Sequence, residues 1–176
     1  MSNRIAEAIS NHNMIALKEM LKADTEVDEL LNLALVSKFI KGVKLLISAG
    51  ADVNHRSGNR EETPLHVAVG RKYTAGVQVL LHRGADPNRK DAYKDTPLHV
   101  ACSFSYRKGV EMLLDYKANP NMKNDAKQTP LHRATLQRFA DGIRLLMGVN
   151  AHVNVRDYIH RTPLILACNK KSSECV

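Results

Sequence analysis

Apolar residues recur along the chain in blocks of 33 residues, and each block holds two helical patterns. In the first pattern, a leucine follows a Thr-Pro pair and an alanine stands three positions later, which places both on one side of a helix. In the second, apolar residues stand at i, i+3 and i+4, a spacing that also predicts a helix. The second pattern is found at Val77, Leu80 and Leu81, at Val110, Leu113 and Leu114, and at Ile143, Leu146 and Met147.

Polar markers keep the same period. The tetrapeptide TPLH stands at 63–66, 96–99 and 129–132, and TPLI follows at 162–165. A second marker reads GADVN at 50–54, GADPN at 84–88, KANPN at 117–121 and NAHVN at 150–154. The first two of these lie 34 residues apart, so the loop at 55–62 carries one extra residue. A fixed period of about 20–50 residues is typical of a repeat array, in which each unit buries its apolar face against its neighbours.

Each marker has a physical interpretation. The threonines suit an N-cap, and the proline after each suits the first helical position. Gly84 suits the left-handed residue that ends a helix, whereas Lys117, at the equivalent position, is expected to strain the turn. The inward-facing leucines are expected at 65, 98, 131 and 164, and a column of small residues at Ala68, Ala101, Ala134 and Ala167.

These features together resemble the ankyrin repeat family, which implies an all-α solenoid of stacked helix-turn-helix units with short hairpin fingers. Weaker matches upstream, such as Leu31 with Ala34 and Ile5 with Ala8, extend the resemblance over nearly the whole chain. We therefore expect one domain over residues 1–176. It comprises a helical N-terminal cap pair at 1–24, repeats at about 25–58, 59–92, 93–125 and 126–157, and a partial repeat at 158–176.

The histidines and cysteines do not predict a metal site. Because His66, His99 and His132 occupy equivalent places in helices about 8–10 Å apart, they cannot share a zinc ion, which needs its nitrogens at about 2.0–2.1 Å. The resemblance implies instead that each imidazole links neighbouring units through a hydrogen bond. Cys102 and Cys168 lie two repeats apart, too far for a disulfide, and Cys175 is expected to be an exposed thiol. No motif for catalysis or phosphate binding is found, so we expect no enzyme, no cofactor and no metal.

Three departures from the family pattern are informative. At the finger tips the family usually has glycine, but this chain has Glu61, Lys94, Lys127 and His160, so a positive φ there costs about 1 kcal/mol per residue. Such a cost favours a role in recognition, although drift in a tolerant loop explains it equally well. An aromatic column replaces the histidine between the helices, at Phe39, Tyr73, Tyr106 and Phe139, and each aromatic residue precedes a glycine by three positions (Gly42, Gly76, Gly109 and Gly142). We expect the rings to pack between repeats rather than bind ligand, in the space that each glycine leaves.

Charge narrows the choice of partner. The net charge is +8 and the isoelectric point about 9.5, but the basic residues are dispersed, without dense runs or interleaved aromatic residues. We therefore favour an acidic protein surface over nucleic acid. No apolar stretch is long enough for a membrane span and no secretory signal is recognisable. With only three cysteines, these observations predict a cytoplasmic or nuclear protein.

The expected function is a non-enzymatic adaptor or inhibitor that binds a partner protein on its concave finger and first-helix face. The alternatives are a basic scaffold associated with nucleic acid, and the repeat domain of a larger protein. The resemblance also predicts hydroxylation of Asn54 by an asparaginyl hydroxylase. The candidate partner-binding residues are Arg89, Lys90, Tyr93, Lys94, Lys123, Lys127, Arg156, Tyr158, His160 and Arg161 on the fingers, with Arg71, Phe104, Arg133 and Gln137 on the first helices.

The last pattern breaks off after its first helix, because the position expected for the next core residue is Val176. We therefore expect residues from about 158 to fray and Ile143, Leu146 and Met147 to be partly exposed. A partner, a second copy of the chain or further residues would then cover them.

Overall fold

The computed structural model describes residues 2–21 and 27–171, and over these residues it contains eleven helices and no strand. Contacts group the chain into two compact units, unit 1 (Met1–Asp86) and unit 2 (Pro87–Val176). The helices of unit 1 are α1 (Ser2–Ser10), α2 (Met14–Met20), α3 (Val27–Val36), α4 (Ile40–Ser48), α5 (Pro64–Gly70) and α6 (Thr74–His82). Those of unit 2 are α7 (Pro97–Ser103), α8 (Arg107–Asp115), α9 (Pro130–Leu136), α10 (Ala140–Gly148) and α11 (Pro163–Lys171).

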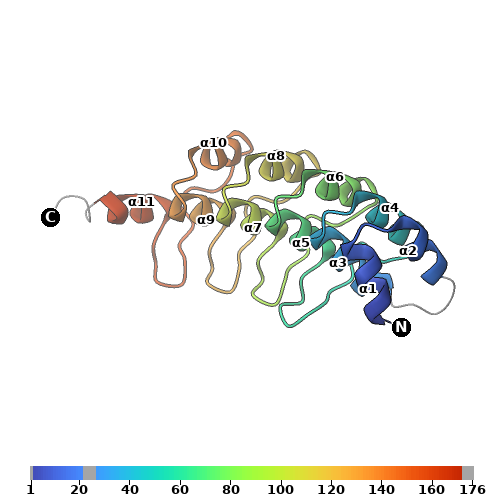
Figure 1. Cartoon of the computed structure of the whole chain (residues 1–176). Helices are drawn as coiled ribbons and strands as arrows, with labels where there is room; N and C mark the ends of the chain where they lie inside the picture. Colours follow the sequence, from blue (N-terminus) through green and yellow to red (C-terminus); the bar gives the residue numbers. More distant parts are fainter. Residues whose placement is uncertain (1, 22–26, 172–176) are drawn as a thin grey trace. The chain divides into compact units, whose positions relative to one another are not determined.

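Each unit has two layers of helices. In unit 1, α3 packs on α4 and α5, and α4 also packs on α6 (Figure 1). In unit 2, α7 and α9 lie side by side with α8 and α10 above them in the view of Figure 1, and α11 extends the lower row. Within each unit, we call α3, α5, α7, α9 and α11 the first helices and α4, α6, α8 and α10 the second helices. The predicted all-α repeat solenoid is confirmed.

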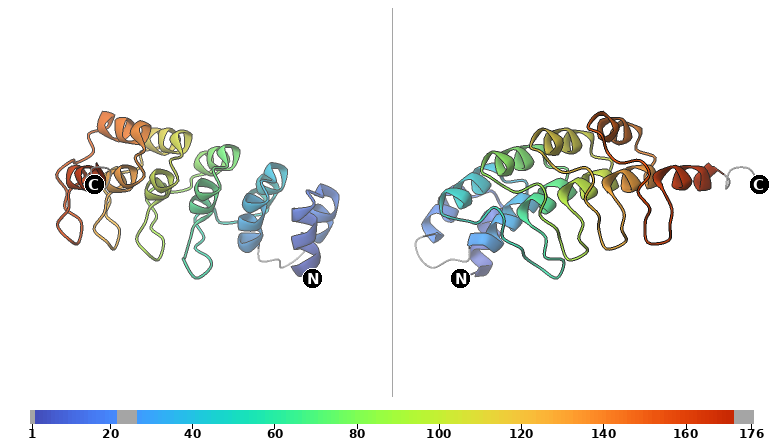
Figure 2. Two further views of the ribbon diagram at one scale, coloured as in Figure 1. Left: turned by 60° about the vertical axis from the view of Figure 1, so that its left-hand side comes forward. Right: turned by 180° about the vertical axis from the view of Figure 1, so that it is seen from behind.

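Hairpin loops, here called fingers, leave each unit from the edge of its first-helix layer (Figure 2). Unit 1 has the finger at 55–62, called the first finger. Unit 2 has the fingers at 89–95, 122–128 and 155–161, called the unit 2 fingers. Each finger precedes the first helix of its repeat. Its last residues therefore lie next to the N-terminus of that first helix.

The core between the layers is aliphatic, as the repeated apolar positions predict. In unit 2, Leu98, Ala101, Val110 and Leu113 are completely buried. In unit 1, Leu31, Ala34, Val43 and Leu46 occupy the equivalent positions and are also completely buried. Because each core layer repeats, the hydrophobic stabilisation is distributed along the array rather than centred on one cluster.

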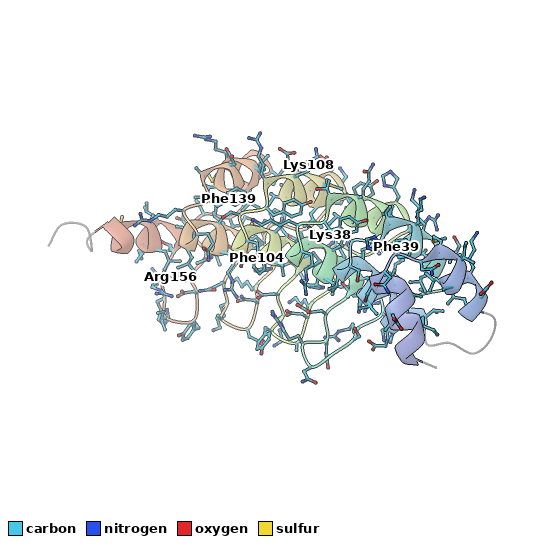
Figure 3. The ribbon with its side chains drawn as sticks, in the orientation of Figure 1. Lys38, Phe39, Phe104, Lys108, Phe139 and Arg156 are labelled. Atoms are coloured by element: carbon cyan, nitrogen blue, oxygen red, sulfur yellow. The ribbon has the colours of Figure 1, made fainter. Side chains whose placement is uncertain are left out.

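The aromatic column explains the glycines of the second helices. A Cβ atom added at Gly109 would lie 2.2 Å from Cδ1 of Tyr106, and one added at Gly76 would lie 2.5 Å from Cδ1 of Tyr73. Phe39 and Phe139 lie against Gly42 and Gly142 in the same way, and Figure 3 shows Phe139 between α9 and α10. Phe39, Tyr106 and Phe139 are buried. The expectation that each ring fills the space its glycine leaves is confirmed.

The turns between first and second helices contain a strain that the sequence analysis missed. Lys38, Lys72, Ser105 and Arg138 have φ of 53°, 49°, 49° and 53°. The left-handed conformation is unfavourable for residues with a Cβ, and a buried core on both sides of the turn holds it in place. The strain predicted at Lys117 is also present, with φ of 64°.

At the C-terminal end, three expectations were wrong. Leu164 is 71% exposed and Ala167 is exposed too, whereas Leu146 is completely buried. Leu98 and Leu131 are buried because α9 and α11 pack on their helices, but within the described residues no helix follows α11. Met147 is 50% exposed, as expected. Cys175 and Val176 lie outside the described residues, and fraying from about residue 158 stays a prediction.

Candidate interaction surface

A buried side chain closes each of the unit 2 fingers. Asp91 Oδ1 accepts hydrogen bonds from the backbone N–H groups of Tyr93 and Asp95, both at 2.9 Å. In the last finger, Asp157 Oδ1 accepts from Ile159 at 3.1 Å and from Arg161 at 2.9 Å. Asn124 is the equivalent residue of the middle finger, and all three are at least 95% buried because their relative exposures are 2%, 5% and 2%. The three stand five residues before each capping threonine, a signal that the sequence analysis did not use.

The finger tips have positive φ, which confirms the cost predicted there. The values are 56° at Lys94, 55° at Lys127 and 63° at His160, and 49° at Glu61 in the first finger. The N–H of Lys94 donates to the carbonyl of Asp91 at 3.0 Å, so the tip closes a tight turn. All four side chains are exposed. The geometry therefore presents them to solvent at a cost in backbone strain.

The unit 2 fingers are bonded to one another. The backbone N–H of Asp125 donates to the carbonyl of Tyr93 at 3.1 Å, and that of Tyr158 donates to the carbonyl of Ala126 at 3.0 Å. Lys94 pairs with Asp125 across the same step at 2.7 Å. These bonds join the three unit 2 fingers into one surface. The backbone of that surface is held by hydrogen bonds within the chain.

The asparagines of the GADxN markers link successive repeats inside each unit. In unit 2, Asn88 Oδ1 accepts from the N–H of Asn119 at 2.7 Å, and Asn121 Oδ1 accepts from that of His152 at 2.7 Å. In unit 1, Asn54 accepts from the N–H of Asp86 at 2.8 Å and donates to the carbonyl of Gly84 at 3.2 Å. The side chain of Asn54 is half-buried and makes these two hydrogen bonds. Its hydroxylation stays a prediction.

The histidines of the TPLH motifs are structural. The backbone N–H of Thr96 donates to Nδ1 of His99 at 3.1 Å, so this nitrogen is unprotonated and Nε2–H donates to the carbonyl of Gln128 at 3.0 Å. His132 bonds in the same way to Thr129 and, at 3.2 Å, to the carbonyl of Arg161. His99 and His132 therefore each join their helix to the next finger, which confirms the inter-repeat link for these two histidines. Burial lowers the pKa of His99 to about 4 and also lowers the pKa of His132.

Three half-buried candidate residues make contacts within the chain. Arg161 pairs with Asp157 through Nε and Nη2 at 3.0 and 2.9 Å. Burial opposes ionisation of Asp157, but the hydrogen bonds from the backbone and side chain of Arg161 outweigh it and lower the pKa of this carboxyl. Arg133 binds Asp95 at 3.1 Å, and Lys90 donates to the carbonyl of Lys123 at 3.2 Å. These three residues hold the fingers in place.

The other candidates are exposed. On the fingers these are Arg89, Tyr93, Lys94, Lys123, Lys127, Arg156, Tyr158 and His160. Phe104 and Gln137 are exposed at the C-terminal ends of α7 and α9, and Arg71 is exposed at that of α5 in unit 1. Figure 3 shows Phe104 beside the first-helix layer and Arg156 on the last finger.

The unit 2 fingers and the C-terminal end of α7 carry exposed aromatic and apolar side chains. Tyr93 is 56% exposed, Tyr158 60% and Phe104 52%. Ile159, which the sequence analysis missed, is 46% exposed beside Tyr158. We call Tyr93, Phe104, Tyr158 and Ile159, with the exposed basic residues around them, the finger face of unit 2.

The described part of the chain contains no group of three or more His, Cys, Asp or Glu residues arranged to hold a metal ion. Cys102 is buried, and burial raises the pKa of its thiol, whereas Cys168 is exposed. In residues 2–21 and 27–171, no helix is long and apolar enough to cross a bilayer.

Comparison with known families gave one result over most of the chain. The family model for ankyrin repeats in three copies matches residues 5–91, 31–124 and 98–176. A search of curated protein sequences gave no significant match.

Proposed function

The chain belongs to the ankyrin repeat family, whose repeats generally bind other proteins, and we propose that it is a non-enzymatic adaptor or inhibitor. The partner is a protein, held on the finger face of unit 2. This proposal places the protein in the cytoplasm or the nucleus.

The observation that carries the proposal is a pair of exposed tyrosines on fingers whose backbones are joined by hydrogen bonds. Tyrosine and arginine are enriched among the residues that dominate protein–protein binding energy. Tyr93 and Tyr158 lie more than half exposed on fingers that backbone hydrogen bonds join together. Because the fingers are already ordered, binding loses little conformational entropy.

The charge of this face favours an acidic partner. Each of the segments 89–95, 122–128 and 155–161 carries one net positive charge at neutral pH. Arg161 of the last finger is paired with buried Asp157. The exposed basic residues of this finger are therefore Arg156 and His160. Complementary charge of this kind raises the association rate and suppresses wrong partners.

The test compares two variants of the full chain in affinity capture with quantitative mass spectrometry. Y93A/Y158A removes the two exposed tyrosines of the fingers, whereas K18A/K41A removes two exposed lysines from α2 and α4 as a control. The proposal expects proteins that the wild type and the control capture equally and that Y93A/Y158A loses by at least about tenfold. Equal capture by all three would contradict it.

The net charge of +8 supports a second candidate, a scaffold associated with nucleic acid. Binding to random duplex DNA at several salt concentrations separates the two. Useful affinity at physiological salt with a steep log–log salt dependence would favour the scaffold, because phosphate contacts release counterions.

A further inference from the structure

A groove lies between α4 and α6 on the second-helix side of unit 1. Its volume is about 330 Å³, at the lower end of the roughly 300–1,000 Å³ of small-molecule sites. It therefore suits a few side chains better than a whole cofactor. The lining residues are Ile40, Lys44, Ala75, Gln78, Val79, His82 and Arg83.

The groove combines an apolar floor with a basic rim. Ile40, Ala75 and Val79 supply the apolar part, and Lys44 and Arg83 are exposed at the rim. No acidic residue occurs in residues 39–51 or in residues 63–85, so neither helix carries a carboxylate to neutralise them.

The equivalent positions of unit 2 are filled by ion pairs. Counting from the aromatic residue before each second helix, Ile40, Lys44 and Ala75 correspond to Arg107, Glu111 and Asp141. There Arg107 pairs with Glu111 at 2.9 Å along α8 and with Asp141 of α10 at 3.5 Å. Unit 2 thus satisfies its charges on this side internally, and unit 1 leaves basic groups beside apolar atoms.

We propose that the groove between α4 and α6 is a docking site for an acidic amphipathic helix of a partner protein. Two packed helices leave a channel between them that a third helix can follow, with apolar residues at i, i+3 and i+7 on the floor. Carboxylates flanking that apolar stripe then meet Lys44 and Arg83. A bare polyanion would use the rim but not the apolar floor. The site lies on the second-helix layer and so goes beyond the proposed function of the finger face.

The probe is a labelled 18-residue peptide with blocked ends, with leucines at helical i, i+3 and i+7 spacing and glutamates beside them. A second peptide has the same composition but no apolar stripe. Fluorescence anisotropy measures binding of both to the full chain, and a 20-base-pair DNA duplex and vesicles with phosphatidylserine serve as other anionic probes. The proposal expects the striped peptide to bind at least about tenfold more tightly than the other peptide, since only it matches the floor.

Two variants locate the site. K44E/R83E reverses the rim, and R138E/R144E makes the same charge change in unit 2. We expect at least a tenfold loss of striped-peptide affinity for the first variant and less than a twofold change for the second. A75R fills the floor while it adds positive charge, so it should weaken the striped peptide but not the DNA.

Circular dichroism and thermal unfolding check that each variant is folded, and A75K, which also fills the floor and adds positive charge, replaces A75R if A75R is not folded. Equal binding of the two peptides would overturn the proposal, as would unchanged binding to K44E/R83E. Binding of DNA or vesicles that K44E/R83E abolishes, without binding of the striped peptide, would overturn it in favour of a polyanion or membrane site. None of these outcomes depends on the finger face, which Y93A/Y158A tests separately.

Discussion

The first finger and the unit 2 fingers close the same kind of loop in different ways. The first finger has one more residue, and a backbone pair between Ser57 and Glu62 closes it, with Gly58 at φ of 68°. Its charges pair locally, Arg56 with Glu61 and Arg60 with Glu62. The unit 2 fingers are instead closed by buried Asp91, Asn124 and Asp157 and expose tyrosines at their ends.

The two units also differ in where their charged side chains form ion pairs. The first finger pairs its charges within its own loop, whereas in unit 2 the exposed Lys94 pairs with Asp125 of the neighbouring finger. In unit 1 Lys44 and Arg83 flank a groove whose lining holds no acidic residue, and in unit 2 the second helices carry internal ion pairs. The two units therefore differ on the second-helix layer, where only the second helices of unit 2 carry carboxylates that pair with basic residues.

The largest expected effect tests the histidine that joins α7 to the middle finger. Because the pKa of His99 is about 4 in the folded state and about 6.5 when unfolded, its stabilisation is complete above pH 6.5 and is lost as the pH falls toward 4. By pH 4 the loss from His99 alone is about 3 kcal/mol. Urea unfolding of the wild type and of H99Q between pH 4 and 7 measures it. If the free energy of unfolding of H99Q fell with pH as steeply as that of the wild type, His99 would not be the cause of the loss.

Removal of the buried carboxylate of the last finger should cost nearly as much. Asp157→Ala leaves two backbone N–H groups and Arg161 without their acceptor, which costs about 2–3 kcal/mol. Ser57→Ala, in the first finger, removes one hydrogen bond from Asn32 but keeps the backbone pair that closes the loop, so it should cost about 0.5–1.5 kcal/mol. Chemical unfolding at pH 7 compares the two variants. Equal losses would mean that the two kinds of finger do not differ in how they are closed.

The aromatic column is expected to be the same in both units. Gly109→Ala and Gly76→Ala should each destabilise by about 1–2 kcal/mol, because the new Cβ displaces Tyr106 or Tyr73. Gly148→Ala is the matched control, since nothing lies within 4 Å of its Cβ position, and it should stabilise by up to about 1 kcal/mol. Thermal unfolding shows whether each of these three variants is more or less stable than the wild type. A stabilised G109A would show that the ring moves aside at no cost.

The smallest expected effect is at the finger tips. It tests whether the residues with positive φ serve recognition or only reflect sequence drift in a tolerant loop. Lys94→Gly and Glu61→Gly should each stabilise by about 0.5–1 kcal/mol, because glycine accepts positive φ. If Lys94 is there for recognition, K94G should also lose captured partner while E61G does not. Partner capture that K94G leaves unchanged would favour drift in both units.

Much of the fold was predictable because its signals are local. The hydroxyl of Thr63 caps α5 by accepting from the backbone N–H of His66, and Gly76 is explained by Tyr73 three residues earlier. The role of His99 followed from the resemblance to the ankyrin repeat family, and its bond to the carbonyl of Gln128 agrees with it. The site was less predictable, because Arg133, Lys90 and Arg161 look like exposed cations in the sequence.

The amino-acid sequence by itself determined the period, the helix pairs, their caps and the family, since these depend on residues within one repeat. Only the tertiary structure decided which charges remain available. Asp95 and Asp157 neutralise Arg133 and Arg161, while nothing acidic lies along the α4–α6 groove. It also decided that Leu146 is buried and Leu164 exposed, although both occupy repeated apolar positions. The physical reason is that burial and ion pairing depend on what the neighbouring helix places opposite, which a repeat pattern alone does not specify.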